Sequence, residues 1–184
     1  MTLPELIRET KAGSVAAQQY LFDQLSPRLL ILCRRYVKNP EDAEERMLDG
    51  FYKFFKNLSS FHYQSDAALY AWLKRVMINE CLMHLRKKNV FKIVSESAAN
   101  DIPWEEDMLD NLSAAEIFNL VVQLPVGYRT VFNLYMIEGM EHKEIAGLLD
   151  ISEGTSKSQL SKAKNLLQKM LLSKGIDYVK HRSK

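Results

Sequence analysis

The residues with the most informative chemistry lie near the C-terminus, in a segment rich in Ser, Lys and Gln. An apolar stretch with helical spacing ends at Leu149, a short turn follows over 150–152, and a second helical stretch comes after it. Ser152 is a good N-cap for the second helix, because its hydroxyl can accept from the amide of Gly154 or Thr155. Two helices joined by so tight a turn are typical of the helix-turn-helix, which lays its second helix in the DNA major groove.

The second helix of this pair is expected to have two faces. Its buried face is predicted by a small and apolar stripe at helical spacing, Ser156, Leu160, Ala163 and Leu167. Lys157, Ser158, Ser161, Lys162 and Asn165 are expected outside, and with Thr155 and Gln159 they are the candidate contacts to duplex DNA. Cations suit phosphates, and short donors and acceptors suit base edges. An amphipathic helix with a solvated face would show the same pattern, so the segment alone leaves both interpretations open.

A group of carboxylates forms a second candidate site, on a helix predicted over 40–57. Asp42, Glu45 and Asp49 point away from an apolar face made by Met47, Leu48, Phe51, Phe54, Phe55 and Leu58. The carboxylates form either a solvated surface or a docking site for a basic partner. A metal or acid–base site is disfavoured, because no His lies among them and no facing helix carries Glu-x-x-His.

A basic ridge is the third candidate, on a helix predicted over 66–88 that is apolar around most of its circumference. Arg75, Asn79 and Arg86 fall within about 40° of one another on the helical wheel. Lys87 and Lys88 crowd the C-terminal end, where the helix dipole favours cations in any case. The functional alternative is a ridge that follows a phosphate backbone.

The loop before that helix, Phe61-His62-Tyr63-Gln64, sets aromatic rings beside hydrogen-bonding groups. Stacking and holding an unpaired base requires such a mixture. Phe61 and Tyr63 could equally serve to cover the core.

The elements that position these candidates are helical along nearly the whole chain, without strand alternation. Helix starts are predicted at Pro4, Ser14, Ser26-Pro27, Asn39-Pro40 and Ser65-Asp66, each a capping residue or a proline at the first helical position. The predicted helices cover 4–11, 14–25, 27–38, 40–57, 66–88, 113–124, 127–138, 141–149 and 153–172. We therefore predict an all-α chain of two helical domains, 1–90 and 113–184, joined by an acidic linker over 91–112.

Composition agrees with this organisation. The chain has 184 residues, of which 47% are hydrophobic, enough for one large or two small domains. Without an apolar run of about eighteen residues or a signal-peptide core, a soluble intracellular protein is expected. Cys33 and Cys81 lie in apolar stretches and are expected to be reduced core residues. The net charge is +4 over 1–90, −5 over 91–115 and +3 over 116–184, which fits two nucleic-acid-facing domains around an acidic connector.

Taken in order, these segments resemble the extracytoplasmic-function (ECF) sigma factors of bacterial RNA polymerase. Region two of that family is resembled by Asp42-Ala43-Glu44-Glu45, Asp49-Gly50-Phe51, Ala71-Trp72-Leu73, Asn79 and Leu85-Arg86-Lys87-Lys88. Region four is resembled by Leu124-Pro125, Arg129, Val131-Phe132, Glu138-Gly139, Glu144-Ile145-Ala146 and the run 154–160. The matches cover nearly the whole chain, and the acidic linker falls where the family has its connector.

The resemblance implies a factor that binds core RNA polymerase and directs it to promoters, without being an enzyme. Region four would read the upstream (−35) element as duplex DNA, and Asp42, Glu45 and Asp49 of region two would dock on the polymerase clamp. A flipped base of the start-proximal (−10) element would be captured through Phe61, His62, Tyr63, Gln64, Arg75, Asn79, Arg86 and Lys87. No cofactor, metal or small-molecule substrate is expected. An anti-sigma factor is implied as a further partner, with a cytoplasmic location, or one at the inner membrane when that partner holds the chain there.

The sequence departs from the family pattern at several positions. Leu48 stands where Gln is usual and is expected on the buried stripe, while Arg46 replaces a residue that is usually apolar. Met83 stands where Asp is common, and Asp150 replaces a frequent Gly in the turn.

Two other functions stay open on the residues alone. One is a stand-alone helix-turn-helix regulator that binds duplex DNA without polymerase, and the other is an all-α enzyme or metal-binding bundle using the carboxylates of 40–57.

Overall fold

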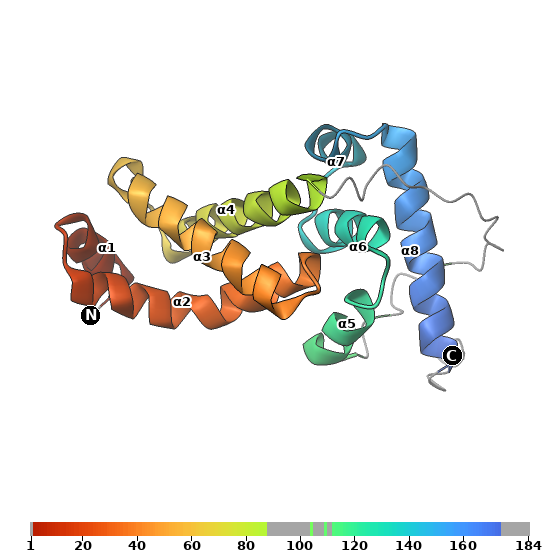
Figure 1. Cartoon of the computed structure of the whole chain (residues 1–184), viewed down its shortest axis with the longest axis horizontal. Coiled ribbons are helices and arrows are strands. Elements are labelled where there is room, and N and C mark those ends of the chain that lie inside the picture. The colour runs from red at the N-terminus through yellow and green to blue at the C-terminus, as the bar shows by residue number, and fades with distance from the viewer. Residues whose placement is uncertain (1, 88–103, 105–108, 110–111, 174–184) are drawn as a thin grey trace, which may run out of the picture. The chain divides into compact units, whose positions relative to one another are not determined.

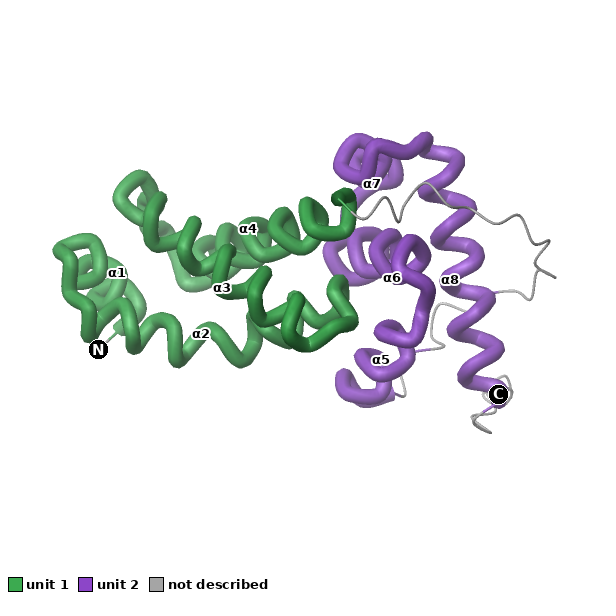
Figure 2. Tube along the Cα trace, in the orientation of Figure 1, with its two compact units in different colours: residues 1–88 green, residues 89–184 purple. Residues whose placement is uncertain are grey.

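The structure, a computed structural model, describes residues 2–87, 104, 109 and 112–173, and every regular element within them is a helix (Figure 1). The chain divides into two units, Met1–Lys88 and Asn89–Lys184 (Figure 2). The all-α prediction is therefore confirmed. Most of the linker expected over 91–112 lies outside the described residues.

Unit 1 contains α1 (Leu3–Lys11), α2 (Val15–Tyr36), α3 (Pro40–Asn57), the single 3-10 turn η1 (Leu58–Ser60) and α4 (Asp66–Lys87). The expected caps begin two of these helices. Ser14 Oγ accepts from the amide of Ala17 at 3.3 Å, and Asn39 Oδ1 accepts from the amide of Asp42 at 2.7 Å. Each side chain satisfies an amide that the first helical turn leaves unpaired.

The separate helices expected over 14–25 and 27–38 are wrong, because α2 runs without interruption past Pro27. Proline removes one amide donor from a helix and crowds the preceding turn. Its ring lies on the exposed side of α2, while Leu21 and Leu29 on either side of it are fully buried. Shared burial of the two flanking segments thus holds one continuous helix.

The core of unit 1 lies between α2, α3 and α4, which pack against one another, with α1 against α2. The two cysteines, Cys33 and Cys81, are free thiols buried in this core, as predicted. Gly50 of α3 faces Met77 of α4, because a Cβ at this glycine would overlap the Met77 side chain. A side chain at that position would force the flexible end of Met77 to move.

Leu48 is not buried as expected, since 47% of it is exposed. The apolar stripe of α3 is centred on Met47, Phe51 and Phe54, all of which are buried. Leu48 lies about 100° from Met47 on the helical wheel, at the border of the stripe. It therefore stands beside the core and not in it.

Unit 2 contains α5 (Ala114–Val121), α6 (Val126–Phe132), the π-helical segment η2 (Asn133–Ile137), α7 (His142–Leu149) and α8 (Glu153–Ser173). The helix expected over 127–138 is thus a short α-helix that widens into a π-helix at the buried Asn133. The helix expected over 113–124 ends at Val121. The long α8 packs along α6 and α7, and its predicted stripe of Ser156, Leu160, Ala163 and Leu167 is buried.

Candidate nucleic-acid interface

The turn between α7 and α8 has the geometry that the sequence predicted. Asp150 adopts the left-handed conformation with φ 55° and ψ 49°, which Asp tolerates better than most residues other than Gly. Ser152 Oγ then accepts from the amide of Thr155 at 2.9 Å and lies 2.8 Å from the Thr155 hydroxyl. The two helices therefore form a capped helix-turn-helix, with the Thr155 side chain engaged in the cap.

The exposed side of α8 carries most of the predicted DNA-facing residues. Lys157 and Ser161 are exposed, and Ser158 and Lys162 are half-buried. Lys157 Nζ lies 2.8 Å from a carboxylate oxygen of Glu153, one turn earlier, and this hydrogen bond lowers the pKa of Glu153. An exposed pair of this kind contributes little to stability, so Lys157 can exchange its partner for a phosphate at small cost.

Two of the predicted DNA contacts are buried instead. Gln159 is 2% exposed and lies against α6, where a Cβ on Gly127 would stand 3.0 Å from its Oε1. Asn165 is 7% exposed, so the expectation that it lies outside is wrong. It stands about 170° around the helix from the middle of the apolar stripe. At this level α8 is therefore covered on its outer side as well.

His142 of α7 contacts both α8 and η2, and the sequence did not reveal this role. Its Nδ1 lies 2.9 Å from the buried hydroxyl of Ser156 in the first turn of α8. Its ring stacks on Tyr135 of η2 with centroids 4.5 Å apart. Burial, followed by the charge of Lys157, lowers the pKa of His142, which favours the neutral imidazole in this position.

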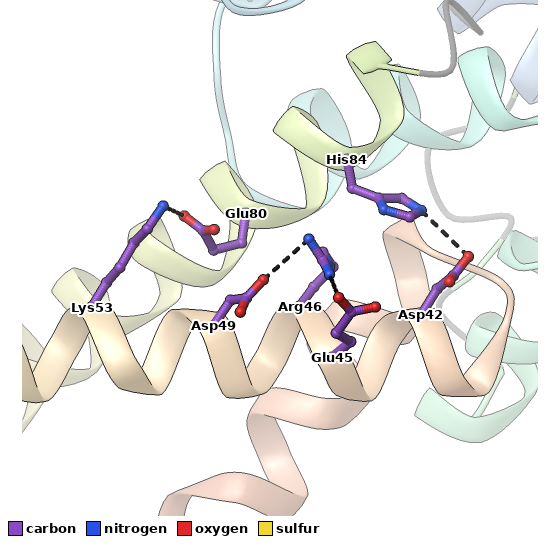
Figure 3. A network of polar contacts seen from close by, with 7 residues as sticks. All are labelled: Asp42, Glu45, Arg46, Asp49, Lys53, Glu80 and His84. Carbon is purple, nitrogen blue, oxygen red and sulfur yellow. Dashed lines mark hydrogen bonds and ion pairs between the residues drawn. The ribbon is translucent and has the colours of Figure 1, made fainter.

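The carboxylates of α3 share one side of the helix, but a half-buried cation, Arg46, lies among them (Figure 3). Arg46, whose side chain is 14% exposed, contacts Glu45 and also Asp49, the latter at 3.1 Å. Its Nε is buried without a hydrogen-bond partner. The i,i+3 spacing of Arg46 and Asp49 is visible in the sequence and could have predicted this pair. The face is consequently less negative than its three carboxylates suggest.

Side chains of α4 make further polar contacts with side chains of α3, which we call the α3–α4 polar seam (Figure 3). His84 Nε2 lies 3.4 Å from an oxygen of Asp42. Further along, Lys53 Nζ lies 2.5 Å from Glu80, a carboxylate whose side chain is only 6% exposed. These contacts join residues 27 or more positions apart, so no sequence pattern signals them.

The loop before α4 has both aromatic and polar groups, yet its two aromatic side chains already make contacts with α4. Phe61 stacks on Trp72 with centroids 4.6 Å apart and planes at 3°, so one face of its ring is covered. The Tyr63 hydroxyl donates to the carboxylate of Asp66, which raises the pKa of Tyr63. His62 and Gln64 are exposed. The polar residues of the loop are thus the more accessible ones.

The basic ridge of α4 lies on one exposed side, as its spacing predicted. Arg75, Asn79, Arg86 and Lys87 are all exposed. The rise of an α-helix places Arg75 about 14 Å from the start of α4 and Arg86 about 16 Å further along. The ridge therefore resembles a path for an extended chain more than a pocket.

Other kinds of site find little support in the part of the chain that the structure describes. No group of three or more His, Cys, Asp or Glu side chains there could hold a metal ion. None of the described helices has the length and apolar composition needed to cross a bilayer.

These features define a helical DNA-binding protein with a helix-turn-helix in its second unit, and comparison with known proteins places it further. Residues 21–90 match the Sigma-70 region 2 family and residues 109–167 match the Sigma-70 region 4 family. The ECF RNA polymerase sigma factor SigM of Mycobacterium tuberculosis is 30% identical over 168 residues, covering 89% of this chain and 83% of SigM. The chain belongs to the ECF sigma factors, and it directs promoter-specific initiation by RNA polymerase.

Other relatives span the chain equally well. The RNA polymerase sigma-H factor of Pseudomonas aeruginosa is 26% identical over 180 residues, covering 91% of this chain and 92% of that protein. SigW of Bacillus subtilis is 24% identical over 184 residues, covering 93% and 97%. Among solved structures, CnrH in complex with the cytosolic domain of CnrY matches with a TM-score of 0.47 and 20% identity, covering 91% of this chain and 96% of CnrH.

Proposed function

We propose that α8 contacts the upstream promoter element through Lys157, Ser158, Ser161 and Lys162. The observation that carries this proposal is the polar, cationic side of a capped second helix whose other side is buried. Helix-turn-helix proteins present this helix to the major groove, where cations bind phosphates and short polar groups reach base edges. Thr155 is engaged with Ser152, and Gln159 and Asn165 are buried, so these three make the weaker candidates.

Alanine substitution of Lys157 and of Lys162 tests this placement. Loss of a phosphate contact weakens binding to all sequences and reduces the slope of log K against log salt by about 1. The readout is the affinity of the holoenzyme for a promoter fragment at several salt concentrations. Lys169→Ala provides the matched control, because Lys169 is also exposed on α8 but lies three turns beyond Lys157. If both substitutions leave affinity and slope at wild-type values, the placement is wrong.

In unit 1 we propose that Asp42, Glu45 and Asp49 dock on a basic surface of the polymerase clamp. Support comes from the exposure of Glu45 and Asp49, whose side chains are 64% and 47% accessible. Arg46 lies behind them and has the geometry to hold the two carboxylates in place for a cationic partner.

Melted start-proximal DNA is the second proposed ligand of unit 1. The exposed His62 and Gln64 and the ring of Tyr63 would hold an unstacked base, while the ridge of α4 would carry the strand. Phe61 contributes by supporting the loop on Trp72. Flipping a base costs a few kcal/mol, which stacking and hydrogen bonds at the loop would offset. The ridge residues are Arg75, Asn79, Arg86 and Lys87.

The remaining proposals concern the chain as a whole. The domain limits 1–90 and 113–184 are proposed for regions two and four, with 91–112 as the connector. The charge of −5 over 91–115 favours a path for the connector through a basic channel of the polymerase. Replacing its acidic residues with Ser should therefore impair initiation or early escape more than promoter recognition.

An anti-sigma factor is proposed as a partner from the family alone. The proposed location is the cytoplasm, or the membrane when that partner holds the chain there.

A further inference from the structure

Lys11, the last residue of α1, contacts the loop that precedes α4. Its ammonium donates a hydrogen bond to the backbone carbonyl of Phe61, with Nζ 2.5 Å from the oxygen and the two residues 50 positions apart. The helix α1 precedes residues 21–90, the stretch that matches Sigma-70 region 2, so that match assigns the helix no role. The contact joins an element outside the matched stretch to the loop proposed to hold an unstacked base.

The backbone of Lys11 is fixed by the packing and by the end of α1. Leu6 and Ile7 are buried, and α1 packs on α2. The amides of Ala12 and Gly13 donate to carbonyls about one turn earlier, each at 3.0 Å, which closes the helix. Gly13 has a φ of +89°, a value that residues with a Cβ rarely adopt. The side chain of Lys11 therefore extends from a well-packed helix end.

Phe61 is held through its amide, its ring and its carbonyl. Its amide donates to the carbonyl of Leu58 at 3.1 Å, and its ring stacks on Trp72 with centroids 4.6 Å apart. Its carbonyl accepts the hydrogen bond from α1. The far end of the loop is also fixed, because Ser65 Oγ accepts from the amide of Ala68 at 3.1 Å. The intervening residues are the ones proposed to hold the base.

We propose that Lys11 is a positioning residue, which holds the carbonyl of Phe61 and thereby keeps the loop in the shape that captures an unstacked base. This inference rests on the proposed function of the loop. A loop that is already ordered loses less conformational entropy when its ligand binds, so a contact that orders it increases affinity without touching the ligand. The partner of Lys11 is a neutral carbonyl, so the role depends on its hydrogen bond to the backbone.

The first test measures the stack of Phe61 on Trp72 in the absence of DNA. In a Trp104→Phe background Trp72 is the sole tryptophan of the chain, which has two in all. Phe61→Leu removes the stacked ring and provides the emission spectrum and the acrylamide quenching of an uncovered indole. Lys11→Ala should shift both toward these reference values, because the released loop covers Trp72 for less of the time. Identical emission and quenching in Lys11→Ala and its parent overturn the proposal.

Two further variants are matched controls for the loss of Lys11. Lys11→Arg keeps a long cationic donor and should retain the emission of the parent. Arg8→Ala removes an equal charge from an exposed position about one turn earlier on α1 and should retain it as well. If Arg8→Ala shifts the emission as far as Lys11→Ala does, the effect belongs to α1 as a whole and the specific contact with Phe61 is refuted.

The second test measures open-complex formation on duplex promoters by the holoenzyme. Lys11→Ala should reduce it about three-fold or more, as expected for the loss of one hydrogen bond from a charged donor, and Lys11→Arg should restore it. The slope of log K against log salt should stay at the wild-type value. A slope reduced by about 0.7 would instead identify a direct contact of Lys11 with a single-stranded phosphate and overturn the positioning role.

The double variant with Tyr63→Ala and Gln64→Ala separates this inference from the function on which it rests. Normal open-complex formation by the double variant refutes the proposed function of the loop, and the positioning role falls with it. An impaired double variant together with a normal Lys11→Ala refutes the positioning role alone. Impairment of both, with the shift in Trp72 emission, supports the proposal.

Discussion

Arg129 shows how much of unit 2 depends on one buried side chain. It is 5% exposed, and its Nη1 donates to the carbonyls of Leu124 at 3.0 Å and Val122 at 3.3 Å. These carbonyls follow the end of α5, where helical partners are missing. Burial lowers the pKa of Arg129, yet a guanidinium keeps its proton at any physiological pH. The charged guanidinium of Arg129 therefore stabilises the corner between α5 and α6 by donating hydrogen bonds to two backbone carbonyls.

Arg129→Lys should destabilise the protein by about 1–3 kcal/mol, because one ammonium cannot reproduce the fork and leaves buried carbonyls unpaired. Urea denaturation followed by circular dichroism measures this change. Arg75→Lys, an equally conservative change at an exposed position, should alter the free energy of unfolding by less than about 0.5 kcal/mol. Equal stability of Arg129→Lys and wild type would show that the two carbonyl bonds contribute nothing.

At the residue scale, turn and capping residues could be predicted from residue type. The burial of a side chain by residues distant in the sequence could not. The Ser152 cap and the permissive Asp150 follow from residue type within one turn. The burial of Gln159 depends on how closely Gly127 lets α6 approach, which no spacing in α8 reveals. Leu48 was misplaced for a related reason, since the width of the buried stripe is set by the helices that pack on it.

At the scale of elements, α3 allows a closely matched test of the polymerase-docking proposal. Glu45 and Glu44 are adjacent and exposed but point about 100° apart on the helix. Glu45→Gln should weaken core polymerase binding, and Glu44→Gln, with the same loss of charge, should change it much less. Both retain the side-chain length and should keep wild-type melting temperature. Gel filtration or titration of holoenzyme formation provides the measurement, and equal effects of the two variants would make the patch a solvated surface only.

The loop before α4 is tested by separating DNA melting from duplex recognition. Tyr63→Ala combined with Gln64→Ala should impair open-complex formation on duplex promoters, and promoters pre-melted by mismatches should partly rescue it. Upstream-element binding should stay normal. Tyr63→Phe keeps the ring but loses the hydrogen bond to Asp66, so it distinguishes stacking from support of the loop. Full open-complex formation by the double variant would place the capturing residues elsewhere.

The elements themselves were largely predictable, because caps, prolines and apolar periodicity are local signals. The exceptions have tertiary causes. Pro27 signals a helix start, yet the burial of Leu21 and Leu29 keeps α2 continuous. The helix after Phe132 widens into the π-helical η2, which contains the buried Asn133 and Leu134 and which a regular period does not anticipate. The seam of His84 with Asp42 likewise needs the packing of α4 on α3.

At the scale of the molecule, the chain divides into two units, and a segment of net negative charge lies between two segments of net positive charge. The sequence predicts this division from composition alone, since −5 over 91–115 lies between segments of +4 and +3. Charge distribution could not reveal that Trp104 contacts Lys164, because that contact depends on the course of the connector. An order of motifs, however, was sufficient to indicate the family.

Promoter-specific initiation is tested most directly by start-site mapping with purified chain and core RNA polymerase on genomic DNA fragments. Transcripts that begin at defined sites are expected with the chain and not with core polymerase alone. Lys157→Ala combined with Lys162→Ala should reduce these transcripts while holoenzyme still forms. Transcripts with the same starting points in the presence and absence of the chain, despite complex formation, would show that the chain does not direct initiation.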